Sequence, residues 1–312
     1  MKDLLKTEHL NRSDVEMLLA TAAEFATAPL KASAALANKS VAIYMTKPST
    51  RTRLASETAT AHLGGTPIFL RGDELQIGRG ETIADTARIL SQFCSALIIR
   101  TFKQSDVNEL GAHSSIPVIN ALTDDDHPTQ ALADWLTIRE KFGNDLSGRK
   151  FVYLGDGNNV THAWLVMGAM MGAHVVAATP AELAPHSATL DIARAIAAEN
   201  GGRVEVSHDP MAAAQGASAL YTDVWMSMGD AEELRQKKFK VLAPFAVTEK
   251  MISVTASDSI FMHCLPAHRG EEVEAAVIDG PKSVIWREAF HRRTTIQALL
   301  YHLTRGELKG RN

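Results

Sequence analysis

The sequence predicts an α/β protein with two domains, each a mainly parallel sheet flanked by helices. Its 312 residues are enough for two domains of ordinary size. Short apolar runs alternate with helix-like segments along most of the chain, in two blocks separated by the polar turn at 143–148. Such alternation is typical of parallel strands joined by right-handed crossovers. We therefore expect one domain at 1–140 and a second at 141–290, with a final helix at about 291–304 packing back on the first.

The elements of the first block follow from apolar spacing and from residues that begin or end helices. Apolar positions three and four apart predict helices, and short continuous apolar runs predict buried strands. Pro48, Ser49 and Pro128 mark helix starts, and Gly64-Gly65 marks a helix end. The expected elements are, in order, a helix at 13–27, a strand at 41–45, a helix between Ser49 and Gly64, a helix at 81–93, a strand at 96–100, a short helix at 105–110, a strand at 116–120 and a long helix at 128–142.

The second block repeats the alternation. Its expected strands lie at 151–154, 174–178, 203–206, 219–222 and 260–263, with helices at 160–171 and 188–199 and further helices between the later strands. Ligands bind in such folds at the carboxyl ends of strands. Polar segments that directly follow predicted strands are therefore the candidates for a functional site, which we expect in the cleft between the two domains.

Composition excludes several classes of protein. The formal net charge of −4 gives no global positive field for nucleic acid or an anionic membrane surface. No apolar run reaches the roughly 18 residues that a membrane span needs, and the N-terminal segment lacks the apolar core of a signal peptide. The two cysteines, Cys94 and Cys264, favour a reducing compartment, so we expect a cytoplasmic protein.

The segment Lys47-Pro-Ser-Thr-Arg-Thr-Arg53 predicts an anion site. A helix N-terminus already carries partial positive charge, so Arg51 and Arg53 in its first turn are electrostatically unfavourable unless an anion binds there. The alternative is a solvated helix start with incidental arginines. A Walker-type loop is excluded, because its G-x-x-x-x-G-K-[ST] pattern does not occur.

Six motifs together resemble one family. They are Ser-Thr-Arg-Thr-Arg at 49–53, Glu-Thr-Ile-Ala-Asp-Thr-Ala-Arg at 81–88, His-Pro-Thr-Gln at 127–130, Gly-Asp-Gly-Asn-Asn at 155–159, Asp-Val-Trp-Met-Ser-Met-Gly at 223–229 and His-Cys-Leu-Pro at 263–266. In this order they are similar to the motifs of the aspartate and ornithine carbamoyltransferases, and the second and the fourth to sixth fit the ornithine branch. With Arg292 the resemblance extends over positions 47 to 292, nearly the whole chain.

The resemblance implies a carbamoyl phosphate site. Arg100, His127 and Thr52 would hydrogen-bond the carbonyl oxygen and stabilise the oxyanion that forms as an amine attacks. Gln130 would orient the carbamoyl NH2 group, and Gln76 would lie on a loop lent to a neighbouring subunit, which implies a homotrimer or a multiple of trimers. The implied set is Ser49, Thr50, Arg51, Thr52, Gln76, Arg100, His127, Gln130, Cys264, Leu265 and Arg292.

The two residues before Arg292 differ from the family pattern. Phe290-His291 stand where ornithine enzymes usually have Glu-Asn, and the adjacent Arg293 is a competing candidate. We place Arg292 at the start of the last helix.

The resemblance also implies an ornithine site, made by Asn159, Asp223, Ser227 and Met228. The attacking amine must be neutral, yet a primary side-chain ammonium has a pKa of about 10.4. Cys264 and Asp223 would therefore orient the amine or accept its proton, which with Arg100 and His127 completes the catalytic set. Cys94, inside an apolar run, fits a small buried hydrophobe instead.

The implied reaction is carbamoyl phosphate plus L-ornithine giving L-citrulline and phosphate, with no metal or organic cofactor. No His/Cys cluster has metal-binding spacing, since His263, Cys264 and His268 lack a second pair. Two alternatives stay open: another amine acceptor such as putrescine or a modified ornithine, and a homologue that binds the anion without turnover. Aspartate is disfavoured as acceptor, because Asp223 would repel its additional carboxylate.

Overall fold

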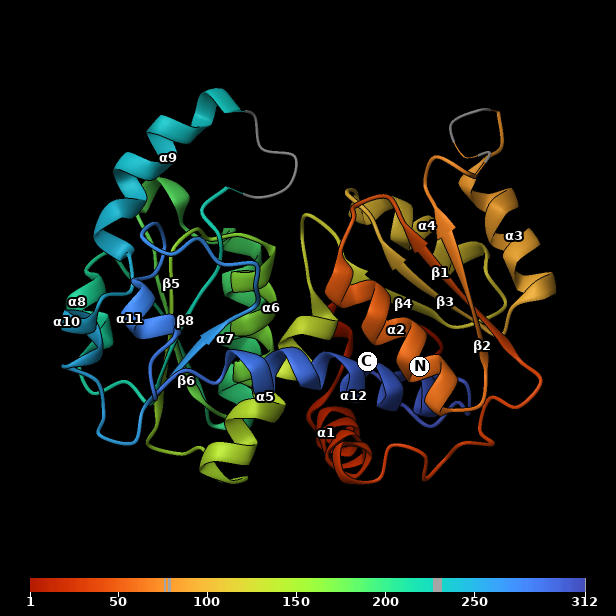
Figure 1. Cartoon of the computed structure of the whole chain (residues 1–312), viewed down its shortest axis with the longest axis horizontal. Helices are drawn as coiled ribbons and strands as arrows, with labels where there is room; N and C mark the ends of the chain where they lie inside the picture. Colours follow the sequence, from red (N-terminus) through yellow and green to blue (C-terminus); the bar gives the residue numbers. More distant parts are fainter. Residues whose placement is uncertain (76, 78–79, 227–231, 312) are drawn as a thin grey trace. The chain divides into compact units, whose positions relative to one another are not determined.

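The computed structural model describes residues 1–75, 77, 80–226 and 232–311. The chain divides into two compact units, the first formed by Met1–Leu136 with Phe290–Asn312 and the second by Thr137–Ala289. Three residues of the predicted site, Gln76, Ser227 and Met228, lie outside the described part of the chain. Each unit contains a parallel sheet with helices around it (Figure 1). The predicted fold class of two mainly parallel sheets flanked by helices is confirmed.

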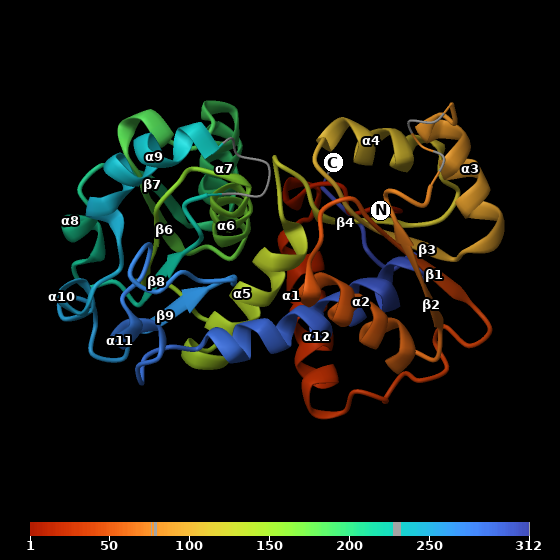
Figure 2. The ribbon, with the colours of Figure 1, turned by 45° about the horizontal axis from the view of Figure 1, so that its top comes forward.

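Unit 1 is built on a four-stranded parallel sheet of order β2-β1-β3-β4. Its strands are β1 (Ser40–Met45), β2 (Thr66–Arg71), β3 (Ala96–Arg100) and β4 (Val118–Leu122). The helices that begin in this part of the chain are η1 (Thr7–His9), α1 (Arg12–Thr27), α2 (Thr50–His62), α3 (Ile83–Phe93), α4 (Gln104–His113) and α5 (Pro128–Phe142). β3 and β4 are buried along their whole length, because helices cover both faces of the sheet (Figure 2).

β2 is the strand that the apolar pattern did not predict. It pairs with β1 at the edge of the sheet, and its residues are only partly buried or exposed. It also contains Pro67, which cannot donate a ladder hydrogen bond and is tolerated because the strand has one neighbour. An edge strand therefore lacks the apolar signal of a central one. The strand predicted at 116–120 lies two residues later, at Val118–Leu122.

Unit 2 is built on a five-stranded parallel sheet of order β7-β6-β5-β8-β9. Its strands are β5 (Lys150–Leu154), β6 (His174–Ala178), β7 (Arg203–Ser207), β8 (Ala219–Thr222) and β9 (Ile260–His263). Its helices are α6 (Asn159–Met170), η2 (Ala181–Leu183), α7 (Ser187–Asn200), α8 (Pro210–Ala214), η3 (Glu232–Leu234), α9 (Arg235–Leu242), η4 (Ala243–Phe245), α10 (Glu249–Ile252) and α11 (Ala275–Ile278). All five strands were predicted within one residue of their observed ends.

The last helix, α12, is longer than predicted. It runs from Ile285 to Leu303, so Arg292 lies inside the helix and not at its start. Predicting its start at residue 291 was wrong, because Trp286, Arg287 and the polar residues after them give no clear apolar stripe. None of the helices in the described part of the chain is long and apolar enough to cross a membrane.

Strand register brings the candidate segments of each unit to one sheet edge. In unit 1, Met45 of β1 is paired with Arg100 of β3, and the Thr46 amide donates to the Arg100 carbonyl at 3.0 Å. In unit 2, Thr222 of β8 lies between Leu154 of β5 and His263 of β9. Since the strands are parallel, the residues that follow them gather at their carboxyl ends.

Candidate active site

The start of α2 is a capped helix N-terminus. Ser49 is the N-cap, and its hydroxyl accepts a hydrogen bond from the Thr52 amide at 3.2 Å. A cavity of about 600 Å³ opens beside Ser49 and Thr50 at the ends of β1 and β2. Arg53 is held by its own helix, because it donates to Glu57 at 3.0 Å and stacks on the Phe69 ring. Arg53 nevertheless lines the same cavity, together with Ser49 and Thr50.

His127 is buried next to a group of cations in unit 1. It is 4% exposed and directly precedes α5. Burial holds the pKa of His127 well below its usual range, and the nearby charges of Arg292, Arg100, Arg51 and Lys47 lower it further. The imidazole is therefore neutral at pH 7 and can donate one hydrogen bond without carrying charge.

The cations themselves are largely shielded from solvent. Lys47, Arg100 and Arg292 are 3%, 7% and 2% exposed. Lys47 forms an ion pair with Asp124 and lies over the Phe102 ring. Like charges gathered in a buried place repel one another, and an anion bound among them would offset that repulsion. Lys47 begins the segment that predicted the anion site, but it was not itself among the predicted site residues.

Arg292 belongs to the same group. Its Nη1 donates to Gln130 Oε1 at 2.5 Å, and its Nη2 donates to the hydroxyls of Thr52 and Thr129 at 3.3 Å each. Arg293 instead contacts His62 and Gln297. The structure therefore brings Arg292, rather than its neighbour, together with predicted site residues.

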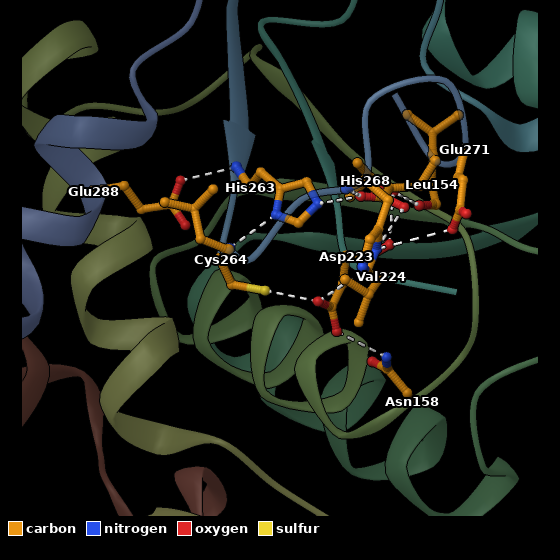
Figure 3. Close-up of polar contacts among 12 residues, drawn as sticks. Leu154, Asn158, Asp223, Val224, His263, Cys264, His268, Glu271 and Glu288 are labelled. Carbon is orange, nitrogen blue, oxygen red and sulfur yellow. Dashed lines mark hydrogen bonds and ion pairs between the residues drawn. The ribbon is translucent and has the colours of Figure 1, made fainter. Parts of the chain in front are cut away.

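Unit 2 contains a thiol and a carboxylate in direct contact. The Cys264 thiol donates to Asp223 Oδ1 across 2.8 Å, and the Asn158 amide donates to Asp223 Oδ2 at 3.1 Å (Figure 3). Asn158 also caps α6, because its Oδ1 accepts from the amides of Val160 and Thr161. The motif at 155–159 predicted Asn159 as the site residue and gave no indication of the contact made by Asn158. Asn159 is the first residue of α6, and its Oδ1 accepts from the Val160 amide.

The turn that carries Cys264 is held by His263. Its amide donates to Glu288 Oε2 at 3.0 Å (Figure 3). Its Nδ1 accepts from the Leu265 amide at 2.8 Å. Because Nδ1 is an acceptor, the proton lies on Nε2, which donates to Glu272 Oε1 at 3.2 Å. Leu265 has a φ of +60°, an unfavourable conformation for a leucine that these contacts maintain.

Cys94 lies among apolar residues, as its sequence context predicted, but it is not fully buried. It is half-buried and packs against the apolar cluster of unit 1. Burial raises the pKa of its thiol, which lowers the fraction present as the thiolate. The two cysteines therefore differ in environment, and only Cys264 contacts a carboxylate of the candidate site.

These features define a two-domain α/β transferase. Residues 2–140 match the family described as "Aspartate/ornithine carbamoyltransferase, carbamoyl-P binding domain", and residues 147–303 match its "Asp/Orn binding domain". The chain belongs to the aspartate/ornithine carbamoyltransferase family.

Individual relatives are similar over nearly the whole chain. The ornithine carbamoyltransferase of Hyperthermus butylicus is 45% identical over 303 residues, 96% of each chain. That of Pyrococcus horikoshii is 48% identical over 275 residues, 88% of this chain and 86% of the relative. The structure of the Pyrococcus furiosus ornithine carbamoyltransferase superposes with a TM-score of 0.93 at 44% identity, covering 99% of this chain and 98% of the other. The anabolic enzyme of Campylobacter jejuni gives 0.92 at 33% identity, covering 98% and 100%.

Proposed function

We propose that the protein transfers the carbamoyl group of carbamoyl phosphate to the side-chain amine of L-ornithine, giving L-citrulline and phosphate. The observation that carries this proposal is the group of cations around a buried neutral histidine in unit 1. A cradle of this kind suits a small ligand with a phosphate at one end and a carbonyl oxygen at the other.

Unit 1 would bind carbamoyl phosphate. The phosphate accepts hydrogen bonds from the start of α2, at Ser49, Thr50 and Thr52, and pairs with Arg51. Arg100 and His127 donate to the carbonyl oxygen, where negative charge develops when the amine attacks. Gln130 and Arg292, which are hydrogen-bonded to each other, orient the ligand from the side of α5 and α12. Cys264 and Leu265, on the turn after β9, complete the proposed contacts to carbamoyl phosphate.

Unit 2 would bind ornithine. Asn159, Ser227 and Met228 would hold the amino-acid end, and Asp223 would pair with an ammonium. The contact between Cys264 and Asp223 supports a shared role at the δ-amine, because both groups can accept its hydrogen bonds. Loss of one proton gives the neutral amine, which attacks the carbamoyl carbon. As the C–O bond breaks, the phosphate leaves and takes up the second proton lost by the attacking nitrogen. Chemistry of this kind requires no metal or organic cofactor.

The identity of the acceptor is tested with a panel of amines. Purified protein with carbamoyl phosphate is given L-ornithine, putrescine, N-acetylornithine or L-aspartate, and the ureido product is measured. We expect product with ornithine at a kcat/KM at least tenfold above the others. A preference for putrescine or a modified ornithine would replace the proposed substrate, and no product with any amine would indicate a non-catalytic homologue.

We further propose that the protein acts as a homotrimer or a multiple of trimers in the cytoplasm. Gln76 would enter the site of a neighbouring subunit, and the free state of both cysteines suits a reducing compartment. Mixing inactive Arg51→Ala chains with inactive Gln76→Ala chains should then restore part of the activity, because one site can draw its arginine and its glutamine from different chains. Full activity of Gln76→Ala alone, or no recovery despite proven subunit exchange, would contradict a shared site.

A further inference from the structure

The loop that follows β9 gathers three potential metal ligands outside the proposed substrate site. His268, Glu271 and Glu272 each offer one ligand atom, and these atoms lie within 4.8 Å of one another. His268 Nδ1 is 3.9 Å from Glu271 Oε2 and 3.6 Å from Glu272 Oε2 (Figure 3 labels His268 and Glu271). A tetrahedral ion about 2.1 Å from its ligands keeps them roughly 3.4 Å apart. The two separations from His268 Nδ1 exceed that spacing by only about 0.5 and 0.2 Å, which is on the order of thermal motion.

Glu272 supplies an independent sign that a cation belongs here. Its side chain is fully buried, and its Oε1 accepts from the His268 amide and from His263 Nε2. Its other oxygen, Oε2, is also buried and has no hydrogen-bond partner among the residues that the structure describes. A buried carboxylate oxygen without a donor raises the free energy of the folded protein. This oxygen faces His268 Nδ1, and a bound cation would satisfy it.

The backbone holds the three ligands in place. The Gly270 amide donates to the Val273 carbonyl at 2.8 Å, in a turn where Gly270 adopts a φ of +89°. Val273 is fully buried and forms a bridge with Val247 in the core of unit 2. A cation site built on a fixed turn loses little conformational entropy on binding.

We propose that His268, Glu271 and Glu272 bind a divalent transition-metal cation of the Zn²⁺ type. One imidazole and two carboxylates suit such a borderline ion, whereas Mg²⁺ prefers oxygen ligands alone. The competing explanation is an ion pair of protonated His268 with the two glutamates. Arg235 pairs with Glu271 Oε1 at 2.9 Å, which leaves Oε2 for the cation but places a positive charge nearby. Spacing of His and Cys residues did not predict this site, because its other ligands are carboxylates.

The site also adjoins the turn that carries Cys264. Glu272 would share its carboxylate between the cation, through Oε2, and His263, through Oε1. His263 in turn accepts from the Leu265 amide. A carboxylate that binds a metal and also orients a histidine is a common arrangement in metal sites. The proposed cation is therefore two contacts away from the Cys264 turn.

The test is a Zn²⁺ titration of chelator-treated, tag-free full-length protein by calorimetry, with thermal unfolding as a second readout. To exclude binding to the thiol of the substrate site, the titration is repeated with Cys264→Ser. The ligand variants are His268→Ala and Glu271→Gln, neither of which lies in the proposed substrate machinery. The matched control is His174→Ala, which breaks another histidine–glutamate pair, with Glu205.

We expect one Zn²⁺ per chain in the wild type, in Cys264→Ser and in His174→Ala, with an increase in Tm on binding. His268→Ala and Glu271→Gln should each weaken binding by at least about tenfold, the loss seen even for indirect metal contacts. Wild-type affinity in His268→Ala would overturn the proposal, as would loss of binding in Cys264→Ser alone. No Zn²⁺ binding to the wild type would show that the cluster is an ion pair only.

Discussion

Replacing Arg292 by methionine tests the anion site most directly, because the substitution keeps much of the side-chain volume and removes the charge. Arg292 makes one short hydrogen bond to Gln130 and two longer ones to Thr52 and Thr129. A hydrogen bond to a charged group contributes about 1.5–3 kcal/mol, so losing its contact to carbamoyl phosphate should weaken binding by roughly 10- to 150-fold. The fold should survive, because removing one cation from a group of like charges offsets part of the lost bonding.

The same substitution should change the pH dependence of kcat/KM. Arg292 is the strongest of the charges that lower the pKa of His127, so Arg292→Met should raise that pKa. If neutral His127 is the active form, activity in the variant is lost at a higher pH on the acid side than in the wild type. The measurement is a pH profile of kcat/KM for carbamoyl phosphate, with circular dichroism to confirm folding.

Arg293→Met is the matched control. Arg293 lies one residue away and bonds to His62, Gln297 and the Phe25 carbonyl instead. It should lower the free energy of unfolding while leaving the KM for carbamoyl phosphate within about twofold of wild type, because surface and half-buried contacts of this kind act on stability. Equal effects of the two variants on KM, or no effect of Arg292→Met, would refute the assignment of Arg292 to the anion site.

Other substitutions test the remaining site residues and one buried acid, Asp126, which accepts hydrogen bonds from Thr7 and the His127 amide. Arg51→Ala should raise the KM for carbamoyl phosphate or lower kcat more than tenfold at unchanged Tm; unchanged kinetics would remove Arg51 from the site. Cys264→Ser should lower kcat/KM for ornithine and shift its pH profile but leave carbamoyl phosphate binding unchanged. The control variant Cys94→Ser should lower only the free energy of unfolding. Wild-type ornithine kinetics in Cys264→Ser would show that Cys264 is structural. Burial raises the pKa of Asp126 from its usual 3.8 to about 6. The folded protein therefore holds this proton more tightly than the unfolded chain does. The resulting contribution to the free energy of unfolding is present below pH 4 and is lost as the pH rises through 6, a change of roughly 3 kcal/mol. Urea unfolding at pH 4.5 and 7 should therefore show a smaller pH dependence for Asp126→Asn than for wild type, and equal slopes would contradict the raised pKa.

Prediction from sequence succeeded where one local pattern dominates. The central strands β3, β5 and β6 are continuous apolar runs between polar turns. Such runs are typical of strands that are buried on both faces of a sheet. Prediction failed for segments that are partly exposed and have no regular apolar pattern. β2 at the sheet edge is half-exposed and contains a proline, and the first turns of α12 carry no single apolar face.

In the candidate site, too, some residues were predictable from the sequence and others were not. Motifs identified Asp223 and Cys264 as members of one site, and the structure places their side chains in contact. The supporting residues carried no sequence signal. Asn158, which orients Asp223, resembles an ordinary helix cap, and Glu272, which bonds to His263, resembles an exposed acid in a charged loop. Their roles depend on partners that are distant in the sequence and are brought close by strand register.

The sequence by itself determined the fold class, the family and the chemical kind of each site residue, because these follow from local apolar periods and from short contiguous motifs. Only the tertiary structure decided that Arg292, rather than Arg293, reaches Gln130, and that Arg53 is held by Glu57 within its own helix. It also decided which acids are buried, as for Glu272. The physical reason is that a pKa, a hydrogen bond or a metal-ligand distance depends on atoms from several segments, and their separation is set only when the sheets and helices pack.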